Sequence, residues 1–454
     1  MGSTNSFQFK HYQPRPLEII DTTLREGSQS SLLYDHYKYF FNQYDKMEIA
    51  RALILYGVKF IELFAPSVNA QERDDFAAIK SVRDELIMQK GYTFLLAHVR
   101  CHADDIASAI EAGADGLNLY FGLSETAQAY SHGKDLGSIT HSARSLLEEL
   151  RAQYPDLILR FSGEDAFRTS EENLFRVYDE VVPLVDRLGT PDTVGVATPS
   201  GVDQRLACLR QRYPRMEFEG HFHDDRGFSL INALSAVNNG MRYINTTILG
   251  LGERSGITSM TALLFNLYTD KAYDHLEGYN LRGSYPINVM FADKLKKLVP
   301  SKEPVSLTNR THTAGVHQKA VLNNAVTYEA FPLDQFGVNE SEVLLGPLSG
   351  WNIIHYFLKE IKGYSLDEGI ARQITAVFKE RVYEVRGKGS PTEILMNIAE
   401  NKFGLGRIAV PERFQGNILQ RLDESQAYRP EQVSAAEADP DARREASVSL
   451  KRSK

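Results

Sequence analysis

Short runs of β-branched and other apolar residues recur along the first part of the chain, and they alternate with segments whose apolar residues have helical spacing. Helical spacing is found, for example, over residues 46–55 and 142–151. The apolar runs predict strands at residues 17–21, 58–64, 93–99, 116–121, 157–162, 193–197, 217–223 and 243–249. Eight strands that alternate with helices predict an α/β fold, a closed parallel (β/α)8 TIM barrel.

An open, doubly wound sheet would also alternate strands with helices. Such a sheet usually has fewer strands and a glycine-rich phosphate-binding turn after the first strand, and neither feature occurs in this sequence. The barrel is therefore favoured, and its catalytic residues are expected at the C-terminal ends of the strands and in the loops that follow them.

The pattern changes after the predicted barrel, which we place at residues 15–277. Residues 278–405 are mostly helical in pattern, with Pro and Gly between the segments, and predict an accessory region. Residues 406–454 form a C-terminal extension that becomes rich in Ala, Glu, Asp, Arg and Ser and nearly free of aromatic residues. We expect this extension to be largely disordered, together with residues 1–14 at the N-terminus.

Composition limits the classes of partner. The formal net charge is -8 at pH 7, so we expect neither nucleic acid nor an anionic membrane as a partner. No stretch reaches the roughly 18 consecutive apolar residues that a membrane span requires. Cys101 and Cys208 are the only cysteines, which argues against a disulfide framework and predicts a cytoplasmic location.

Two histidines and a carboxylate form a candidate metal site. Because strand side chains alternate between faces, Glu219, His221 and His223 all point the same way, which in a barrel can be the lumen. Glu26 follows the first strand and can complete a set of two imidazoles and one carboxylate for a divalent ion. Such a set leaves positions open for a 2-oxo acid. Two packed or solvent-facing histidines are the alternative interpretation.

The fifth strand places Arg160, Ser162 and Glu164 on one face. A buried arginine is costly unless it is paired, so Arg160 at the mouth of a lumen predicts an anionic partner such as a substrate carboxylate. A salt bridge with Glu164 or with another barrel carboxylate is the alternative. Arg25 follows the first strand and would assist at the keto oxygen of such a substrate, unless it forms a surface salt bridge.

Other polar residues fall where the fold predicts a site. His98 ends the third predicted strand, Asn118 lies in the fourth, Thr193 opens the sixth, and a segment with three glycines, residues 250–256, follows the eighth. Individually, residues such as His98 and Thr193 are more often satisfied core polar groups. Their convergence on one end of the barrel is what predicts a single site.

These residues belong to longer motifs. In the barrel the motifs are residues 21–29 (DTTLREGSQ), 97–102, 130–135, 160–165, 192–195 and 219–223. In the accessory region they are residues 314–317 (AGVH), 328–329, 345–346 and 348–350. Over roughly residues 17–360 the sequence resembles the homocitrate synthase and isopropylmalate synthase family of acyl-CoA condensing barrels, the DRE-TIM metallolyases.

The resemblance implies an acyltransferase that uses one divalent metal ion and joins acetyl-CoA, its co-substrate, to a small 2-oxo acid by a Claisen condensation. Leu251 stands where isopropylmalate synthases tend to have an asparagine near the metal, whereas homocitrate synthases have an aliphatic residue there. The resemblance therefore favours the homocitrate branch, whose substrate is the dicarboxylate 2-oxoglutarate.

The resemblance also implies roles for individual residues. Glu26, His221 and His223 would be the metal ligands. Catalysis would use Arg25 and Glu164 together with His317 and Tyr328, which would reach in from the accessory and dimerisation region (278–405) of a partner subunit in a homodimer. The 2-oxo acid would be bound by Arg25, Gln29, His98, Arg160, Ser162 and Thr193.

Several positions depart from the family pattern and keep other substrates open. Asn118 stands where homocitrate synthases usually have Asp, Ser28 and Ser30 replace Glu and Phe around Gln29, and Asp224 replaces Asn. Oxaloacetate, as in Re-citrate synthase, and phosphonopyruvate are the alternative substrates. A metal-dependent carbon–carbon lyase or aldolase is the alternative from another class of enzyme. The ligand set suits zinc, manganese, magnesium or iron.

Overall fold

The computed structural model describes residues 16–34, 41–270, 275–329, 331–339, 341–385 and 389–406. The chain divides into two compact units. The first unit runs to Asn309 and includes Pro332–Val338, and the second comprises Arg310–Phe331 and the chain from Asn339 onward. The predicted disordered N-terminus (1–14) and, apart from Gly406, the predicted C-terminal extension lie outside the described residues.

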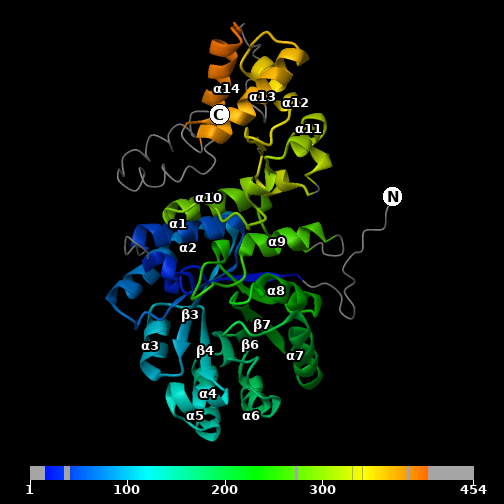
Figure 1. The fold of residues 1–454 in the computed structure, drawn as a ribbon. Coiled ribbons are helices and arrows are strands. Elements are labelled where there is room, and N and C mark those ends of the chain that lie inside the picture. The colour runs from blue at the N-terminus through cyan, green and yellow to red at the C-terminus, as the bar shows by residue number, and fades with distance from the viewer. Residues whose placement is uncertain are drawn as a thin grey trace. The chain divides into compact units, whose positions relative to one another are not determined.

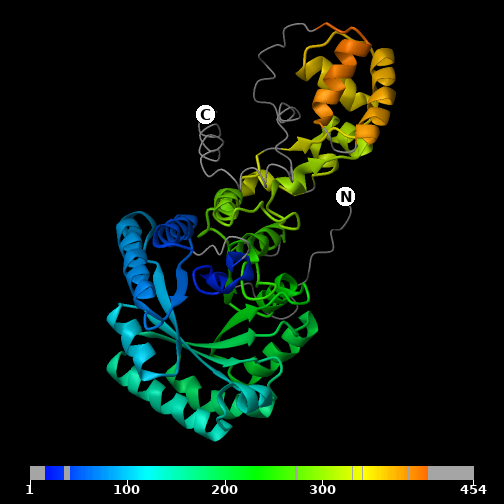
Figure 2. The same ribbon diagram turned by 60° about the vertical axis from the view of Figure 1, so that its left-hand side comes forward.

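The first unit is a closed barrel of eight parallel strands, which confirms the predicted TIM barrel (Figures 1 and 2). Neighbouring strands pair in sequence order, and the last strand pairs with the first. The strands are β1 Glu18–Asp21, β2 Phe60–Phe64, β3 Phe94–Arg100, β4 Gly116–Gly122, β5 Ile158–Glu164, β6 Arg187–Asp192, β7 Glu217–Phe222 and β8 Tyr243–Thr246.

The sixth strand does not lie where the sequence predicted it. β6 covers Arg187–Asp192, so its prediction at residues 193–197 is wrong. The outward positions of this strand are Leu188, Thr190 and Asp192, and with a single outward apolar residue it shows no clear apolar alternation. Thr193 therefore follows its strand, in the loop at the C-terminal end of the barrel.

Helices cover the outside of the barrel (Figure 2). Most begin at a residue whose side chain accepts a hydrogen bond from the first turn, such as Asn42, Asp135, Ser170 and Thr198. The helices of the first unit are α1 Gln43–Tyr56, α2 Ala70–Lys90, α3 Ala103–Glu111, α4 Glu125–Ala127, α5 Leu136–Gln153, α6 Glu171–Val181, α7 Pro199–Arg212, α8 Ser229–Asn238, α9 Met260–Thr269 and α10 Ser284–Lys294.

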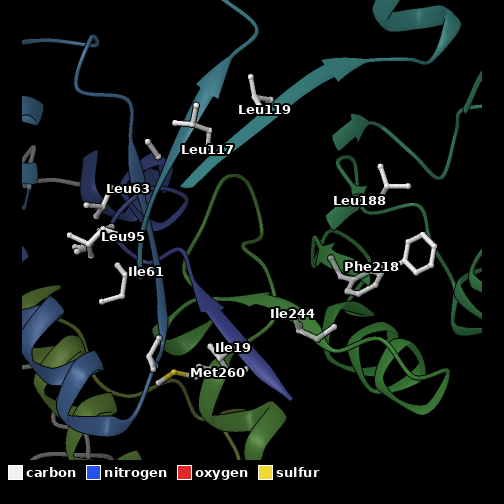
Figure 3. Packing of buried hydrophobic residues seen from close by; sticks show 14 of the residues in the cluster. Ile19, Ile61, Leu63, Leu95, Leu117, Leu119, Leu188, Phe218, Ile244 and Met260 are labelled. Atoms are coloured by element: carbon white, nitrogen blue, oxygen red, sulfur yellow. The ribbon is translucent and has the colours of Figure 1, made fainter. Parts of the chain in front are cut away.

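The two faces of the barrel strands differ in chemistry. Outward side chains such as Ile61, Leu95 and Phe218 are buried in one large apolar core with the helices (Figure 3). Inward residues near the N-terminal ends form a smaller apolar cluster around Phe60 and Leu96. Further along the strands, the inward residues are buried and polar: Glu62, Asn118, Arg160, Ser162, Glu219, His221 and Asn245. Burial of so many polar groups requires partners, so this end of the lumen is where a site is expected.

The first unit extends beyond the predicted barrel boundary. It ends at Asn309 instead of residue 277. Tyr279 donates a hydrogen bond from its hydroxyl to the carbonyl of Leu17 at 3.2 Å, and Phe291 of α10 is fully buried in the barrel's apolar core, where its ring lies 5.7 Å from that of Phe41. The helical segment after β8 is thus part of the barrel unit because it covers α1 and the start of β1.

The second unit is mostly helical, as the sequence predicted. Its helices are α11 Gly315–Asn323, α12 Trp351–Tyr356, α13 Glu368–Val385 and α14 Pro391–Asn397. β9 Thr311–His312 and β10 Glu342–Val343 form a short parallel pair, and β9 directly precedes α11 in the chain. Ile354, Phe357 and Phe378 are fully buried in a core of its own. Within the described residues, none of the helices has the length and apolar character needed to cross a membrane.

Candidate active site and metal centre

A cavity of about 270 Å³ opens at the C-terminal ends of the barrel strands. The barrel residues to which the sequence assigned roles all line it: Arg25, Glu26, Gln29, His98, Arg160, Ser162, Glu164, Thr193, His221 and His223. Asn118, which the sequence also placed near the site, is not among the lining residues and donates to Glu62. Tyr120, Pro191, Asn245, Glu253 and Arg254 line the same cavity. The barrel therefore brings together residues from β3, β4, β5, β6, β7 and β8 and from the four loops that follow β1, β6, β7 and β8.

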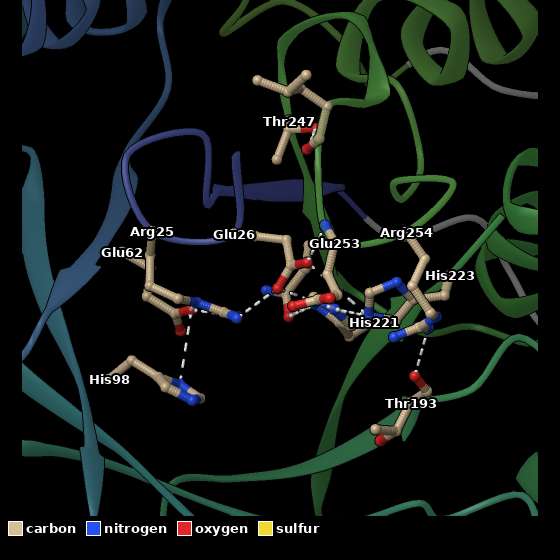
Figure 4. A network of polar contacts seen from close by, with 12 residues as sticks. Arg25, Glu26, Glu62, His98, Thr193, His221, His223, Thr247, Glu253 and Arg254 are labelled. Carbon is tan, nitrogen blue, oxygen red and sulfur yellow. Dashed lines mark hydrogen bonds and ion pairs between the residues drawn. The ribbon is translucent and has the colours of Figure 1, made fainter. Parts of the chain in front are cut away.

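Glu26, His221 and His223 form a group with the spacing of a metal site (Figure 4). Nε2 of His221 lies 3.2 Å from Nε2 of His223 and 3.9 Å from a carboxylate oxygen of Glu26. Nε2 of His223 lies 4.0 Å from the other oxygen. All three side chains are buried, and their donor atoms can converge on one ion.

The charge states of these residues suit metal binding. Burial, together with the neighbouring His223, lowers the pKa of His221 to about 3, and burial also lowers the pKa of His223. Burial opposes ionisation of Glu26, but the adjacent Arg25 outweighs it and the pKa of Glu26 falls to about 2. At neutral pH the group therefore offers two neutral imidazoles and a carboxylate, which are the forms that coordinate a cation. The residues fit a divalent metal ion.

The loop after β8 holds the carboxylate ligand in place. The backbone N–H of Glu253 donates to Glu26 at 2.9 Å. The same loop is attached to the first strand through Thr23, whose hydroxyl accepts from the N–H of Ile248 at 2.9 Å and donates to Asp21 at 3.1 Å. Residues of the opening motif thus fix the loop that orients the candidate ligand.

The substitution Asp21→Asn is expected to change how stability depends on pH. Burial raises the pKa of Asp21 from 3.8 to about 7, although hydrogen bonds from Thr23 oppose the shift. The folded state therefore holds a proton that the unfolded state releases between these pH values, so wild-type stability falls as pH rises through that window. The asparagine side chain of the variant does not titrate. We expect the stability of the variant relative to wild type to rise by a few kcal/mol from about pH 4 to about pH 8, in urea unfolding curves. Parallel pH profiles for the two proteins would contradict this expectation.

Arg25 lies between two carboxylates. Its guanidinium donates to Glu26 at 2.5 Å and to Glu62 at 2.8 Å (Figure 4). Burial opposes the ionisation of Glu62, but Arg25 and then His98 outweigh it and hold its pKa below the ordinary value. Glu62 also accepts a hydrogen bond from the amide of Asn118. This network fixes Arg25 beside the candidate metal ligands, so the surface salt bridge considered from the sequence is not its role.

Arg160 forms a buried ion pair with Glu219 on β7. The salt bridge considered from the sequence therefore exists, with another barrel carboxylate instead of Glu164. Nε of Arg160 and the hydroxyl of Ser162 are buried, and neither has a hydrogen-bond partner within the described residues. Both residues line the cavity. An anion in the cavity could accept hydrogen bonds from both groups.

The other predicted residues of the barrel surround this centre. His98 stacks on Tyr120 with ring centroids 4.5 Å apart, and burial and the proximity of Arg25 lower the pKa of His98 to about 3. Burial and the neighbouring Asp165 raise the pKa of Glu164. The hydroxyl of Thr193 accepts from the N–H of Asp165 at 2.9 Å, which fixes the loop after β6 against the end of β5.

His317 and Tyr328, the two predicted catalytic residues of the accessory region, are neighbours in the second unit. Their rings stack with centroids 4.0 Å apart and an interplanar angle of 28°. The residue after Tyr328, Glu329, accepts hydrogen bonds from Arg310 and from Ser341, both at 2.6 Å. The pair is thus held on a locally fixed segment.

Sequence reasoning missed several polar residues of the lumen, among them Glu62 and Asn245. Glu62 lies in the middle of β2 between Ile61 and Leu63, and Asn245 occupies an inward position of β8. A charged residue inside an apolar strand is a signal that could have identified Glu62. Asn245 has no such signal, because only the pairing of the strands shows that it faces His221.

Two family models match the chain. The model described as HMGL-like matches residues 16–284. The model described as homocitrate synthase post-HMGL domain-like matches residues 305–385, which belong almost entirely to the second unit. Both parts of the chain therefore have counterparts in known proteins, in the same order along the sequence.

Curated relatives match over most of the chain. The cytosolic isozyme of homocitrate synthase from Saccharomyces cerevisiae is 35% identical over 366 residues, which cover 80% of this chain and 81% of the relative. 2-Isopropylmalate synthase 1 from Caldanaerobacter subterraneus subsp. tengcongensis is 31% identical, with 80% and 90% covered. Among solved structures, the HMG-CoA lyase of Bacillus subtilis superposes with a TM-score of 0.54 at 21% identity, over 64% of this chain and 98% of that one, a likeness of fold.

Proposed function

Because the chain belongs to the HMGL-like family and aligns with homocitrate synthases over both of its units, we propose that it condenses acetyl-CoA with 2-oxoglutarate to give homocitrate and CoA. The observation that carries this proposal is the pairing of two features in one cavity. Glu26, His221 and His223 can hold a metal ion, and in the same cavity Nε of Arg160 and the hydroxyl of Ser162 are donors without a partner within the described residues. A 2-oxo dicarboxylate has the complementary groups at its two ends.

Glu26, His221 and His223 would hold the divalent ion. When bound, the ion supplies a Lewis acid for the keto oxygen of the 2-oxo acid. The ligand set suits zinc, manganese, magnesium or iron, and the proposal does not depend on which of them is used. Arg25, fixed by Glu62, provides a permanent positive charge beside the same oxygen.

Arg160 and Ser162 would bind the distal carboxylate of 2-oxoglutarate. His98, Thr193 and Gln29 line the remaining wall, where the C1 carboxylate and the keto group would lie. A branched aliphatic 2-oxo acid would leave the Arg160 and Ser162 donors buried without a partner, which is costly. This cost supports a dicarboxylate over a branched-chain substrate.

A methyl proton of acetyl-CoA must be removed before the new bond forms. His317 and Tyr328 would act as the base and its relay, and Glu164, whose pKa is raised by burial, would assist the proton transfer. The methyl carbon then attacks the keto carbon of 2-oxoglutarate, the resulting alkoxide takes up a proton, and water cleaves the thioester to release CoA. Hydrolysis of the thioester makes the reaction irreversible.

We propose a cytoplasmic homodimer in which the second unit of one protomer completes the barrel site of its partner. Val316 and Val326 are exposed apolar residues, each 74% exposed, on the segments that carry His317 and Tyr328. Leu348 is 67% exposed, and its carbonyl accepts from the N–H of Gly315 at the start of α11. Burial of such residues against a second copy would place the stacked pair at the site. The relative named a cytosolic isozyme supports the location, whereas a second homocitrate synthase of Saccharomyces cerevisiae with the same identity is named mitochondrial.

Replacing Gly189 with alanine is expected to weaken dicarboxylate binding. Gly189 pairs with Ser162 across β5 and β6, and an added Cβ would overlap the hydroxyl of Ser162 and lie 3.0 Å from its Cβ. Loss of the proposed hydrogen bond from the Ser162 hydroxyl to the distal carboxylate should raise the KM for 2-oxoglutarate about 10-fold, while the KM for acetyl-CoA changes little. Gly278→Ala is the matched control, because no atom lies within 4 Å of its added Cβ. An unchanged KM for 2-oxoglutarate in Gly189→Ala would remove Ser162 from the substrate site.

The proposed function is tested by thiol release from acetyl-CoA. Purified protein is assayed with 2-oxoglutarate, oxaloacetate, phosphonopyruvate, pyruvate and 2-oxoisovalerate, each with added divalent metal and with chelator. The proposal predicts that 2-oxoglutarate gives the highest kcat/KM and that chelator abolishes release. A preference for oxaloacetate or phosphonopyruvate would identify that acid as the substrate instead of 2-oxoglutarate. Carbon–carbon bond cleavage without thiol release would show that the protein is a lyase and not an acyltransferase.

A further inference from the structure

A buried chain of hydrogen bonds connects a candidate metal ligand with the arginine of the substrate pocket. Asn245 on β8 is fully buried. Its Oδ1 lies 3.1 Å from Nδ1 of His221, and its Nδ2 donates to Glu219 at 3.0 Å. The same oxygen of Glu219 accepts from Arg160. No residue in this chain of hydrogen bonds other than His221 is a candidate metal ligand, so Asn245 and Glu219 act through their neighbours.

The orientation of the Asn245 amide follows from its two neighbours. Glu219 lies between Arg160 and Arg187, whose Nε is 3.5 Å away, and a carboxylate between two guanidinium groups offers only acceptors. The NH₂ group of Asn245 must therefore face Glu219, which leaves its carbonyl oxygen for His221. A carbonyl oxygen can only accept, so the proton of the neutral His221 ring must be on Nδ1. This tautomer leaves the lone pair of Nε2 directed at Glu26 and His223.

We propose that Asn245 is a positioning residue, which fixes His221 in the tautomer that binds metal and connects it through Glu219 to Arg160. This inference rests on the proposed function, because it assumes a metal ion at Glu26, His221 and His223. Hydrogen-bonded partners of metal-binding histidines are commonly carboxylates or carbonyl oxygens, and their removal weakens metal binding. Here an asparagine provides the carbonyl, and the carboxylate stands one residue further along the chain of hydrogen bonds.

The test measures the affinity of the substrate-free protein for Zn²⁺, by competition with a chromophoric chelator. Asn245→Leu fills a similar volume but accepts no hydrogen bond, and we expect it to bind Zn²⁺ about 10-fold to 100-fold more weakly than wild type. Asn288→Leu is the matched control. Asn288 is also fully buried in the first unit, but it bonds to Thr261 and to the carbonyl of Val305, so its loss should lower stability and leave Zn²⁺ affinity unchanged.

A double variant separates the hydrogen bond from packing. In Asn245→Asp with Glu219→Gln the carboxylate and the amide exchange places and the total charge is preserved. The introduced carboxylate accepts from Nδ1 of His221 and from the NH₂ group of the introduced amide, and only the hydrogen bond from Arg160 to this position of residue 219 is lost. Zn²⁺ affinity within a few-fold of wild type is expected for the double variant. If the leucine variant does not fold, Asn245→Ala removes the same hydrogen bonds and is judged by the same criterion.

The outcomes distinguish this inference from the function on which it rests. Tight Zn²⁺ binding by wild type, weak binding by Asn245→Leu and recovery in the double variant support the inference. Equal Zn²⁺ affinities in folded Asn245→Leu and in wild type would overturn the role of Asn245 alone. Absence of Zn²⁺ binding by wild type would overturn the proposed metal centre and the inference together.

Discussion

Replacing His223 with alanine is expected to reduce thiol release by about 1000-fold, because a Lewis acid contributes several kcal/mol to such a reaction and each 1.4 kcal/mol changes the rate about tenfold. His223 provides one of the three ligand groups that the barrel brings together. Two ligands bind a divalent ion much more weakly than three, so the purified variant should also lose its metal. The measurements are the metal content by mass spectrometry and the kcat for thiol release with saturating 2-oxoglutarate.

His141→Ala is the control for the loss of a histidine as such. His141 is exposed on α5 and lies outside the cavity, so its loss should change neither metal content nor kcat. The free energy of unfolding of metal-free wild type should also be compared with that of metal-free His223→Ala. The buried His223 ring contributes packing whether or not a metal ion is bound. Chelator-sensitive thiol release that persists in His223→Ala would show that the metal is held elsewhere.

Most of the barrel could be predicted because its strands have apolar residues on the outward face. β3 and β5 illustrate this: Leu95, Leu159 and Phe161 point outward and produce the alternation that the sequence shows. β6 was misplaced because Leu188 is its only large outward apolar residue and its inward positions are Arg187, Gly189 and Pro191. The other outward positions of β6 are Thr190 and Asp192, so the strand lacks the outward apolar alternation by which β3 and β5 are recognised.

The members of the site could be predicted, but not their partners. Inward polar residues near strand ends are visible in the sequence, and this is why Arg160 was identified. The ion-pair partner of Arg160 depends on how far along the barrel axis each candidate residue lies, which is called its height here. Glu164 lies four residues further along β5, roughly 13 Å higher at about 3.3 Å per residue, whereas Glu219 on β7 lies at a height where it reaches Arg160. Only the register of β5, β6 and β7 determines that height.

The end of the first unit illustrates a different limit. The sequence of α10 predicts a helix whether that helix covers the barrel or a separate domain. Contacts between residues far apart in sequence, such as Tyr279 with Leu17, determine that this segment packs on the barrel. Periodicity predicts the element and not the surface that it covers.

Replacing Arg160 with methionine is expected to remove the preference for a dicarboxylate. Methionine keeps most of the apolar stem, but it cannot donate a hydrogen bond or carry a charge. Loss of charge-assisted hydrogen bonds, each contributing about 1.5–3 kcal/mol, should lower kcat/KM for 2-oxoglutarate by about 100-fold to 1000-fold. The kcat/KM for pyruvate, which lacks the distal carboxylate, should change by only a few-fold. The measurement is the ratio of the two values in wild type and variant.

Arg160→Lys is the informative control, because it retains the charge and loses the planar fork. Lysine can pair with Glu219 or with the substrate, but it cannot hold both with fixed geometry. An intermediate loss with 2-oxoglutarate is therefore expected. Arg160→Met also leaves Glu219 with Arg187 and Asn245 as its remaining partners, so a lower stability is expected, and both substrates must be compared on the folded variant. Equal losses of kcat/KM for 2-oxoglutarate and pyruvate would mean that Arg160 supports the barrel and does not select the substrate, because only a residue that contacts the distal carboxylate can distinguish the two acids.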